Sequence, residues 1–123
     1  MKLLDDFYIL KQASGEGTDF EYVISLHKEH FIYKAHFPGN PITPGVCIIQ
    51  LCKELMEQQT GETLFLHKIH NVKFLSVIDP RMVDTVRVSF SKISTVEDGY
   101  KFSALVHWET AQFAKLSLFL KRQ

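Results

Sequence analysis

The sequence has 123 residues, with 14 basic and 14 acidic side chains and a formal net charge of zero; 46% of its residues are hydrophobic. This length suits one domain, expected to span residues 1–123, that buries a core without disulfides or metal. The hydrophobic content excludes a disordered chain, and the balanced charge provides no overall field for a nucleic-acid partner.

Two strands are predicted at the start of the chain. Residues 7–11 form a short apolar run, a turn is expected at residues 14–17, and apolar and polar side chains alternate over residues 20–27. Alternation with a period of two is typical of a strand with one buried face. These residues therefore predict a hairpin.

A constrained loop and a long helix are predicted next. Residues 31–43 contain Pro38, Gly39 and Pro41, which favour a loop over a helix or a central strand. Pro44 suits the first turn of a helix, and no helix breaker follows until Gly61. We therefore expect a helix over residues 45–59 that ends at Gly61.

The predicted helix carries an apolar stripe of the kind that faces a core. The stripe comprises Gly45, Ile48, Ile49, Cys52, Leu55, Met56 and Gln59. The first half of the helix is apolar on all sides except at Gln50, which predicts that this half is buried and that the second half emerges into water. Gln50 then requires a hydrogen-bond partner, and Glu54, one turn further on, is expected to face solvent.

The rest of the chain predicts further strands. Apolar side chains alternate over residues 64–74, 86–90 and 102–108, and residues 113–120 form an apolar-rich closing strand. Turns are expected at Asp79-Pro80, at Asp98-Gly99 and near Thr110. Two strands, one long helix and several more strands indicate an α+β fold, with an antiparallel sheet wrapped around one central helix.

The cysteines and the N-terminal residues indicate the cellular compartment of the protein. Cys47 and Cys52 lie about 140° apart around the predicted helix, so no disulfide is expected between them. Free thiols, together with acidic residues at positions 5 and 6 where a signal peptide would be apolar, predict a cytoplasmic protein. No apolar stretch approaches the roughly 18 residues that a membrane span needs, so no membrane association is expected.

Residues 36–46 have the features of a catalytic site. Three prolines and two glycines fix the backbone immediately before the predicted helix. The N–H groups of a helix N-terminus carry partial positive charge and can polarise a carbonyl oxygen. His36 is suited to proton transfer near neutral pH. These features predict a catalytic site at the start of the helix.

The string His-Phe-Pro-Gly-x-Pro-x-x-Pro-Gly-Val at residues 36–46 closely resembles the signature of the 3-hydroxyacyl-ACP dehydratases, where ACP is acyl carrier protein. The similarity extends over nearly the whole chain, including residues 69–85. The resemblance implies a hot-dog fold with an apolar channel for the acyl chain. It also implies dehydration of 3-hydroxyacyl-ACP to trans-2-enoyl-ACP in fatty-acid or related acyl-chain synthesis. It also implies no cofactor, because the substrate is carried on the phosphopantetheine arm of ACP. The implied partners are ACP and a second copy of the chain, as a homodimer or higher homo-oligomer.

The resemblance also implies roles for individual residues. His36 matches the base that removes the α-proton, and Gly45 matches the glycine whose N–H binds the thioester carbonyl. Substrate contacts are expected from Phe37, Pro38, Gly39, Pro44 and Val46. In the family an acidic residue occupies the third catalytic position and faces the histidine of the partner subunit; here that position is Gln50. An amide can bind the substrate hydroxyl but has no proton to give near neutral pH. Glu54, one turn further on, could substitute for this acid, although a solvent-exposed position is expected for it.

Three functional hypotheses remain. The first is a dehydratase in which Gln50 orients the hydroxyl. The second is a non-catalytic acyl-thioester-binding protein or partner subunit, in which Gln50→Glu would restore dehydration. The third is a thioesterase, because hot-dog domains also support hydrolysis. The other histidines show no metal-ligand spacing, so no metal site is expected.

Overall fold

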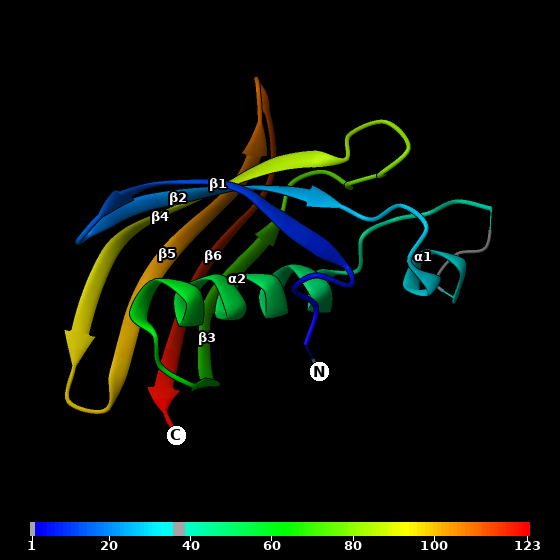
Figure 1. The fold of residues 1–123 in the computed structure, drawn as a ribbon. Helices are drawn as coiled ribbons and strands as arrows, with labels where there is room; N and C mark the ends of the chain where they lie inside the picture. The colour runs from blue at the N-terminus through cyan, green and yellow to red at the C-terminus, as the bar shows by residue number, and fades with distance from the viewer. Residues whose placement is uncertain (1, 36–38) are drawn as a thin grey trace.

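A six-stranded antiparallel sheet curves around one long helix in the computed structural model, which describes residues 2–35 and 39–123 (Figure 1). The elements in chain order are β1 (Tyr8–Glu16), β2 (Asp19–Leu26), α1 (Phe31–Ala35), α2 (Gly45–Thr60), β3 (Leu64–Phe74), β4 (Thr85–Val96), β5 (Gly99–Trp108) and β6 (Ala111–Arg122). The strand order in the sheet is β1-β2-β4-β5-β6-β3, so β1 and β3 form its two edges. The predicted α+β arrangement, with a sheet around a central helix, is confirmed.

The core lies between α2 and the inner face of the sheet. Phe102 of β5 stands opposite Leu118 of β6, and Ala104 stands opposite Leu116; all four are buried. The helix contributes a buried face that consists of Cys47, Ile48, Leu51, Cys52, Leu55 and Met56. The apolar stripes of the strands and of the helix therefore cover one another, as in most two-layer domains.

Both ends of α2 lie close to where the sequence places them. Pro44 is the N-cap residue with extended backbone angles (φ −63°, ψ 143°). Gly61 ends the helix in the left-handed conformation (φ 73°), and its N–H donates to the Glu57 carbonyl oxygen at 2.8 Å. A proline before the first turn and a left-handed glycine after the last are the usual limits of a helix.

Two local predictions near the N-terminus are wrong. Residues 31–35 form the short helix α1 instead of a loop, because the prolines that break helices begin only at residue 38. The first hairpin turns at residues 17–18 instead of 14–17, since β1 continues through Glu16 before the left-handed Gly17. The hairpins at Asp98-Gly99 and near Thr110 are confirmed.

The predicted burial of α2 is also wrong. Val46, in the half expected to be buried on all sides, is 67% exposed, whereas Glu54, expected in solvent, is 5% exposed. The reason is that α2 lies lengthwise against the inner side of the sheet (Figure 1). One face of the helix is therefore covered along its whole length, and the opposite face is open at both ends.

The two cysteines are free and buried, as predicted. Burial raises the pKa of Cys52 to about 12, which leaves it almost entirely as the unreactive thiol near neutral pH. Within residues 2–35 and 39–123, no helix has both the length and the apolar composition required to cross a membrane.

The close contact between β5 and β6 at Gly99 leads to the first prediction. A Cβ atom at this position would lie 1.9 Å from the Leu120 carbonyl oxygen and 2.8 Å from the Lys121 Cα. We expect Gly99→Ala to force the two strands apart and to lower the free energy of unfolding by about 1–3 kcal/mol in urea denaturation. Lys101→Ala, at an exposed position of the same strand, is the control; equal stability of the two variants would contradict the contact.

Candidate active site

The described part of the proline-rich loop is anchored at Thr43. The Thr43 N–H donates to the Ile78 carbonyl oxygen at 2.9 Å, and its hydroxyl lies 2.9 Å from the hydroxyl of Tyr33. The Tyr33 ring stacks on Phe7, with 5.4 Å between ring centroids. Thr43 is only 5% exposed, so this end of the loop is fixed to α1 and to the segment after β3.

The predicted site residues fall into two groups. His36, Phe37 and Pro38 lie outside the described residues. Gly39, Pro44, Gly45, Val46 and Gln50 are described, and the last four lie at the start of α2 or one turn into it. Gly39 adopts a left-handed backbone conformation (φ 82°), which favours glycine.

Gly45, the first residue of α2, lies directly against an aromatic ring. A Cβ atom built on Gly45 would lie 2.6 Å from Cζ of Phe74, at the end of β3. Any larger residue at position 45 would therefore displace this ring. Among the described side chains none caps the helix at Pro44, so the N–H groups of the first turn keep the partial positive charge of a helix N-terminus.

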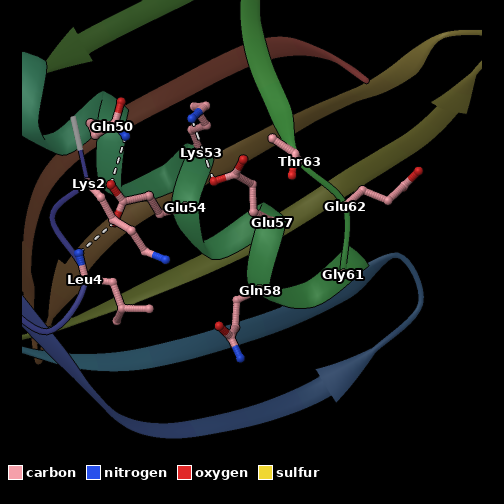
Figure 2. Close-up of a pocket in the computed structure, with 10 residues that line it drawn as sticks. All are labelled: Lys2, Leu4, Gln50, Lys53, Glu54, Glu57, Gln58, Gly61, Glu62 and Thr63. Carbon is pink, nitrogen blue, oxygen red and sulfur yellow. Dashed lines mark hydrogen bonds and ion pairs between the residues drawn. The ribbon is translucent and has the colours of Figure 1, made fainter. Parts of the chain in front are cut away.

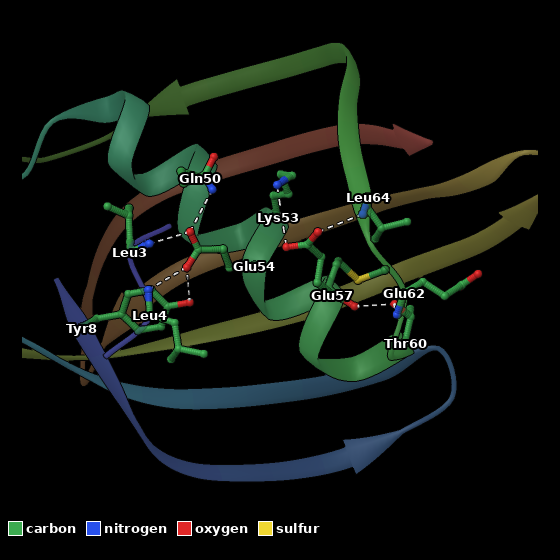
Figure 3. A network of polar contacts seen from close by, with 11 residues as sticks. Leu3, Leu4, Tyr8, Gln50, Lys53, Glu54, Glu57, Thr60, Glu62 and Leu64 are labelled. Carbon is green, nitrogen blue, oxygen red and sulfur yellow. Dashed lines mark hydrogen bonds and ion pairs between the residues drawn. The ribbon is translucent and has the colours of Figure 1, made fainter. Parts of the chain in front are cut away.

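Gln50 is half-buried and pairs with Glu54 one turn further along α2. The Gln50 Nε2 donates to Glu54 Oε2 at 2.8 Å (Figure 3). The same carboxylate accepts the N–H of Leu3 at 2.7 Å, the N–H of Leu4 at 2.8 Å and the hydroxyl of Tyr8 at 3.1 Å. The predicted structural hydrogen bond of Gln50 is therefore present, and its partner is a buried carboxylate that four donors hold in place.

Glu54 is a poor substitute for the acid that position 50 lacks. All four of its partners in the described residues are donors, so the carboxylate acts only as an acceptor in this network. Burial, and then the charge of Glu54, raise the pKa of Tyr8 well above its ordinary value, which keeps the phenol protonated and donating. Glu54 thus ties the N-terminal segment and β1 to α2.

The raised pKa of Tyr8 predicts a loss of stability in alkali. A phenol with a higher pKa in the folded state gives its full stabilisation below pH 10, and this contribution is lost as pH rises above 10, where the unfolded chain ionises. Each such group makes the free energy of unfolding fall more steeply with pH, by up to about 1.4 kcal/mol per pH unit. Urea denaturation between pH 9 and 11.5 is expected to show a shallower decline for Tyr8→Phe than for the wild type. Identical slopes would contradict the buried Tyr8–Glu54 contact.

A cleft of about 530 Å³ lies alongside α2, from Gln50 to the C-cap (Figure 2). Most of the residues that line it have polar or charged side chains; they are Lys2, Leu4, Gln50, Lys53, Glu54, Glu57, Gln58, Gly61, Glu62 and Thr63. Lys53 and Glu57 form an ion pair at 3.7 Å within it. This cleft is not the apolar channel that the sequence predicts, although Gln50 reaches it.

The apolar surface near Gly45 lies on the edge strand β3. Leu66, Ile69 and Phe74 stand opposite the buried residues Leu120, Leu118 and Ala114 of β6, so they face the inner side of the sheet. They are nevertheless 38%, 45% and 52% exposed, because α2 covers this strand only in part, with Gly45 against the Phe74 ring. Across the described chain β3 pairs only with β6, which leaves its other edge open.

The remaining histidines that have described contacts suit structural roles. His30 is buried; its Nδ1 accepts the Ile32 N–H at 3.1 Å and its Nε2 lies 3.2 Å from the Asp6 carboxylate. In the described part of the chain no three histidine, cysteine or acidic side chains gather as metal ligands. Sequence reasoning singled out Glu54 but wrongly expected it in solvent, and it missed Phe74. The spacing of four from Gln50 was the only signal for Glu54, and no pattern indicated the contact of Phe74 with Gly45.

Comparison with known proteins places the fold and the loop in one family. The model of the ApeI-like family, described as ApeI dehydratase, matches residues 11–115. The chain is 28% identical over 120 residues to the 3-hydroxyacyl-ACP dehydratase FabZ of Oenococcus oeni, which covers 92% of this chain and 85% of the relative. It is 31% identical over 113 residues to the FabZ of Levilactobacillus brevis, with 86% and 75% covered.

Two solved structures share the fold. The dehydratase heterocomplex ApeI:P from Xenorhabdus doucetiae aligns with a TM-score of 0.71 and 18% identity, over 93% of this chain and 97% of the other. A hypothetical thioesterase from Streptococcus pneumoniae aligns with a TM-score of 0.63 and 8% identity, over 98% and 93%. At these identities the two structures establish the hot-dog fold.

Proposed function

The chain belongs to the ApeI-like dehydratase family, and we propose that it removes water from 3-hydroxyacyl thioesters carried on ACP, to give trans-2-enoyl-ACP. The observation that carries this proposal is the placement of Gly45 at an uncapped helix N-terminus, directly after the proline-rich loop that holds His36 in the sequence. Gln50 follows on the same helix, about 7.5 Å further along its axis.

Each residue has a role in this reaction. The thioester carbonyl accepts the N–H of Gly45, where the helix dipole stabilises the negative charge that develops on the oxygen. His36 takes the proton from the α-carbon of the acyl chain. Phe37, Pro38, Gly39, Pro44 and Val46 form the surroundings of the thioester. No cofactor takes part, since the substrate is carried on the phosphopantetheine arm of ACP.

The amide at position 50 affects the proton balance. The reaction removes a proton from the α-carbon and a hydroxyl from the β-carbon, and the departing hydroxyl must gain a proton to leave as water. Gln50 cannot supply that proton. We therefore assign it to the imidazolium that His36 becomes after the first transfer, so that the same proton leaves with the hydroxyl and His36 returns to its neutral form. Gln50 holds the hydroxyl in place.

We propose that two copies of the chain form a homodimer along the open edge of β3. The exposed inner side chains Leu66, Ile69 and Phe74 support this, because an uncovered apolar strand edge tends to associate. A second subunit over this edge would also extend the apolar surface that Phe74 provides next to Gly45. A cytoplasmic location agrees with the two free cysteines.

A second function is favoured by one observation, the amide at the position where the family has an acid. In this alternative the chain binds acyl thioesters without turning them over, or serves as a partner subunit of another hot-dog protein. One structural neighbour is a dehydratase heterocomplex, which agrees with an assembly of different subunits. Hydrolysis of the thioester is the third alternative.

Intact mass spectrometry of the carrier protein separates the three functions. The purified chain is incubated with 3-hydroxyacyl-ACP of several chain lengths. Dehydration is expected to lower the mass of the acyl-ACP by one water. A complex with unchanged acyl-ACP would support the binding protein, and free ACP with released acid would support the thioesterase; either result would contradict the proposed function.

A further inference from the structure

Thr43, two residues before Gly45, is attached to two separate parts of the fold. Its N–H donates to the Ile78 carbonyl oxygen at 2.9 Å, in the segment between β3 and β4. Its hydroxyl lies 2.9 Å from the hydroxyl of Tyr33 in α1, which lies beyond the N-terminal end of α2 (Figure 1). Thr43 and Tyr33 are only 5% and 3% exposed, so the hydrogen bond between their hydroxyl groups is buried.

The position of the Tyr33 hydroxyl is itself fixed. The Tyr33 ring stacks on the fully buried Phe7, with 5.4 Å between the ring centroids. The Tyr33 N–H donates to the His30 carbonyl oxygen at 3.1 Å. Burial raises the pKa of Tyr33 well above its ordinary value, which keeps the phenol protonated and able to donate a hydrogen bond near neutral pH. Tyr33 therefore holds the Thr43 side chain in one position.

Only Pro44 lies between Thr43 and Gly45. Its ring restricts φ, which is −63°, so little rotation is possible between Thr43 and the first turn of α2. The Pro44 carbonyl oxygen accepts the N–H groups of Cys47 at 3.0 Å and Ile48 at 3.2 Å. Because the peptide group is planar, these bonds also fix the direction of the Gly45 N–H, which has no acceptor within residues 2–35 and 39–123.

From this geometry we infer that Tyr33 and Thr43 are positioning residues, whose hydrogen bond directs the Gly45 N–H towards the carbonyl oxygen of the bound thioester. The inference rests on the proposed function, in which this N–H stabilises the charge on that oxygen. A donor of this kind acts at about 2.7–3.1 Å from the oxygen, and loss of one donor lowers kcat by about 10²- to 10³-fold. A small displacement of Gly45 therefore lowers the rate, although neither hydroxyl is assigned a contact with the substrate.

A second buried tyrosine makes the same kind of hydrogen bond at the other end of α2. The Tyr22 hydroxyl, in β2, donates to Gln59 Oε1 at 2.7 Å, and Tyr22 is 4% exposed. Gln59 lies in the last turn of α2, about 20 Å from Gly45 along the helix axis. Replacement of either tyrosine by phenylalanine keeps the ring and removes one buried hydrogen bond. Tyr22→Phe is therefore the matched control for Tyr33→Phe.

Kinetics of the two variants test the inference. Tyr33→Phe is expected to lower kcat for 3-hydroxyacyl-ACP by about tenfold to a hundredfold, because the Gly45 N–H loses its alignment. KM should stay within about twofold, since the alignment matters in the transition state. Tyr22→Phe should lose a similar amount of stability in urea and keep the wild-type kcat. Equal losses of kcat in the two variants, or a wild-type kcat in Tyr33→Phe, would overturn the inference.

A double-mutant cycle shows whether the two hydroxyl groups act through each other. Thr43→Val removes the second hydroxyl and should lower kcat as much as Tyr33→Phe does. The double variant should be no slower than either single variant, because all three lack the same hydrogen bond. Thr43→Ser retains a hydroxyl and should retain most of the wild-type kcat. Additive losses in the double variant, or a Thr43→Ser variant as slow as Thr43→Val, would overturn the inference.

A measurement without substrate separates this inference from the proposed function. The backbone amide signal of Gly45 in a ¹⁵N–¹H spectrum depends on the position of this peptide group in the free protein. Tyr33→Phe and Thr43→Val should shift this signal, and Tyr22→Phe should leave it unchanged. A Gly45 signal that neither variant shifts would overturn the inference. A shifted signal in a protein that leaves 3-hydroxyacyl-ACP unchanged would overturn the proposed function and leave the positioning of Gly45 intact.

Discussion

Replacement of His36 by alanine is expected to lower kcat/KM for 3-hydroxyacyl-ACP by about 10²- to 10⁴-fold, the usual contribution of a general acid–base group. The effect should lie at the upper end of this range, because His36 is assigned both proton transfers and Gln50 cannot replace it in either. The measurement is the rate of enoyl formation, followed by absorbance or mass.

His27→Ala is the control for this substitution. The His27 ring is exposed and its Nδ1 lies 2.8 Å from the Asp6 carbonyl oxygen, outside the loop and the first turn of α2. It should retain wild-type kcat. Comparable losses in the two variants would show that His36 has no special role, and the proposed mechanism would then be wrong.

Ile69→Asp is expected to convert a dimer into monomers. Ile69 is 45% exposed at the open edge of β3, so a carboxylate there costs little in the monomer. In a dimer along β3 the same carboxylate would be buried without a partner, which costs about 3 kcal/mol and weakens association roughly a hundredfold. Light scattering after size exclusion measures the mass. Activity should fall in parallel, because the site is completed at the subunit interface.

Met82→Asp introduces the same charge at an apolar residue that is 82% exposed, in the loop between β3 and β4. It should leave the mass unchanged. A wild type that elutes as a monomer at micromolar concentration, or an Ile69→Asp variant with the mass of the wild-type dimer, would contradict an interface along β3.

The architecture could be predicted from the sequence because local signals and the global fold agree. Alternation along β4, β5 and β6 matches one buried face, and Pro44 and Gly61 mark the limits of α2. The burial of α2 could not be predicted in the same way, since residue types specify which side is apolar but not whether the helix enters the sheet end-on or lies along it. For this reason the predicted burial of Val46 and the predicted exposure of Glu54 are both wrong.

The candidate site was predictable only in part. The loop at residues 36–46 points to Gly45 and Gln50 through its resemblance to the dehydratases, and the structure places both on α2. The contacts of Glu54 could not be predicted from the sequence, because its donors Leu3, Leu4 and Tyr8 are 46 to 51 residues away in the chain. The contact of Phe74 with Gly45 likewise joins the end of an edge strand to a helix N-terminus, and no periodicity indicates it.

The proposed function requires that this chain removes a proton from the α-carbon and a hydroxyl group from the β-carbon of an acyl thioester, and that it catalyses the reverse addition of water. The reverse reaction in D₂O tests it most directly, with trans-2-enoyl-ACP as substrate. The wild type should produce 3-hydroxyacyl-ACP that carries one non-exchangeable deuterium on its α-carbon, and His36→Ala should not. Enoyl-ACP that stays unchanged and free of deuterium after prolonged incubation with the wild type would contradict the claim.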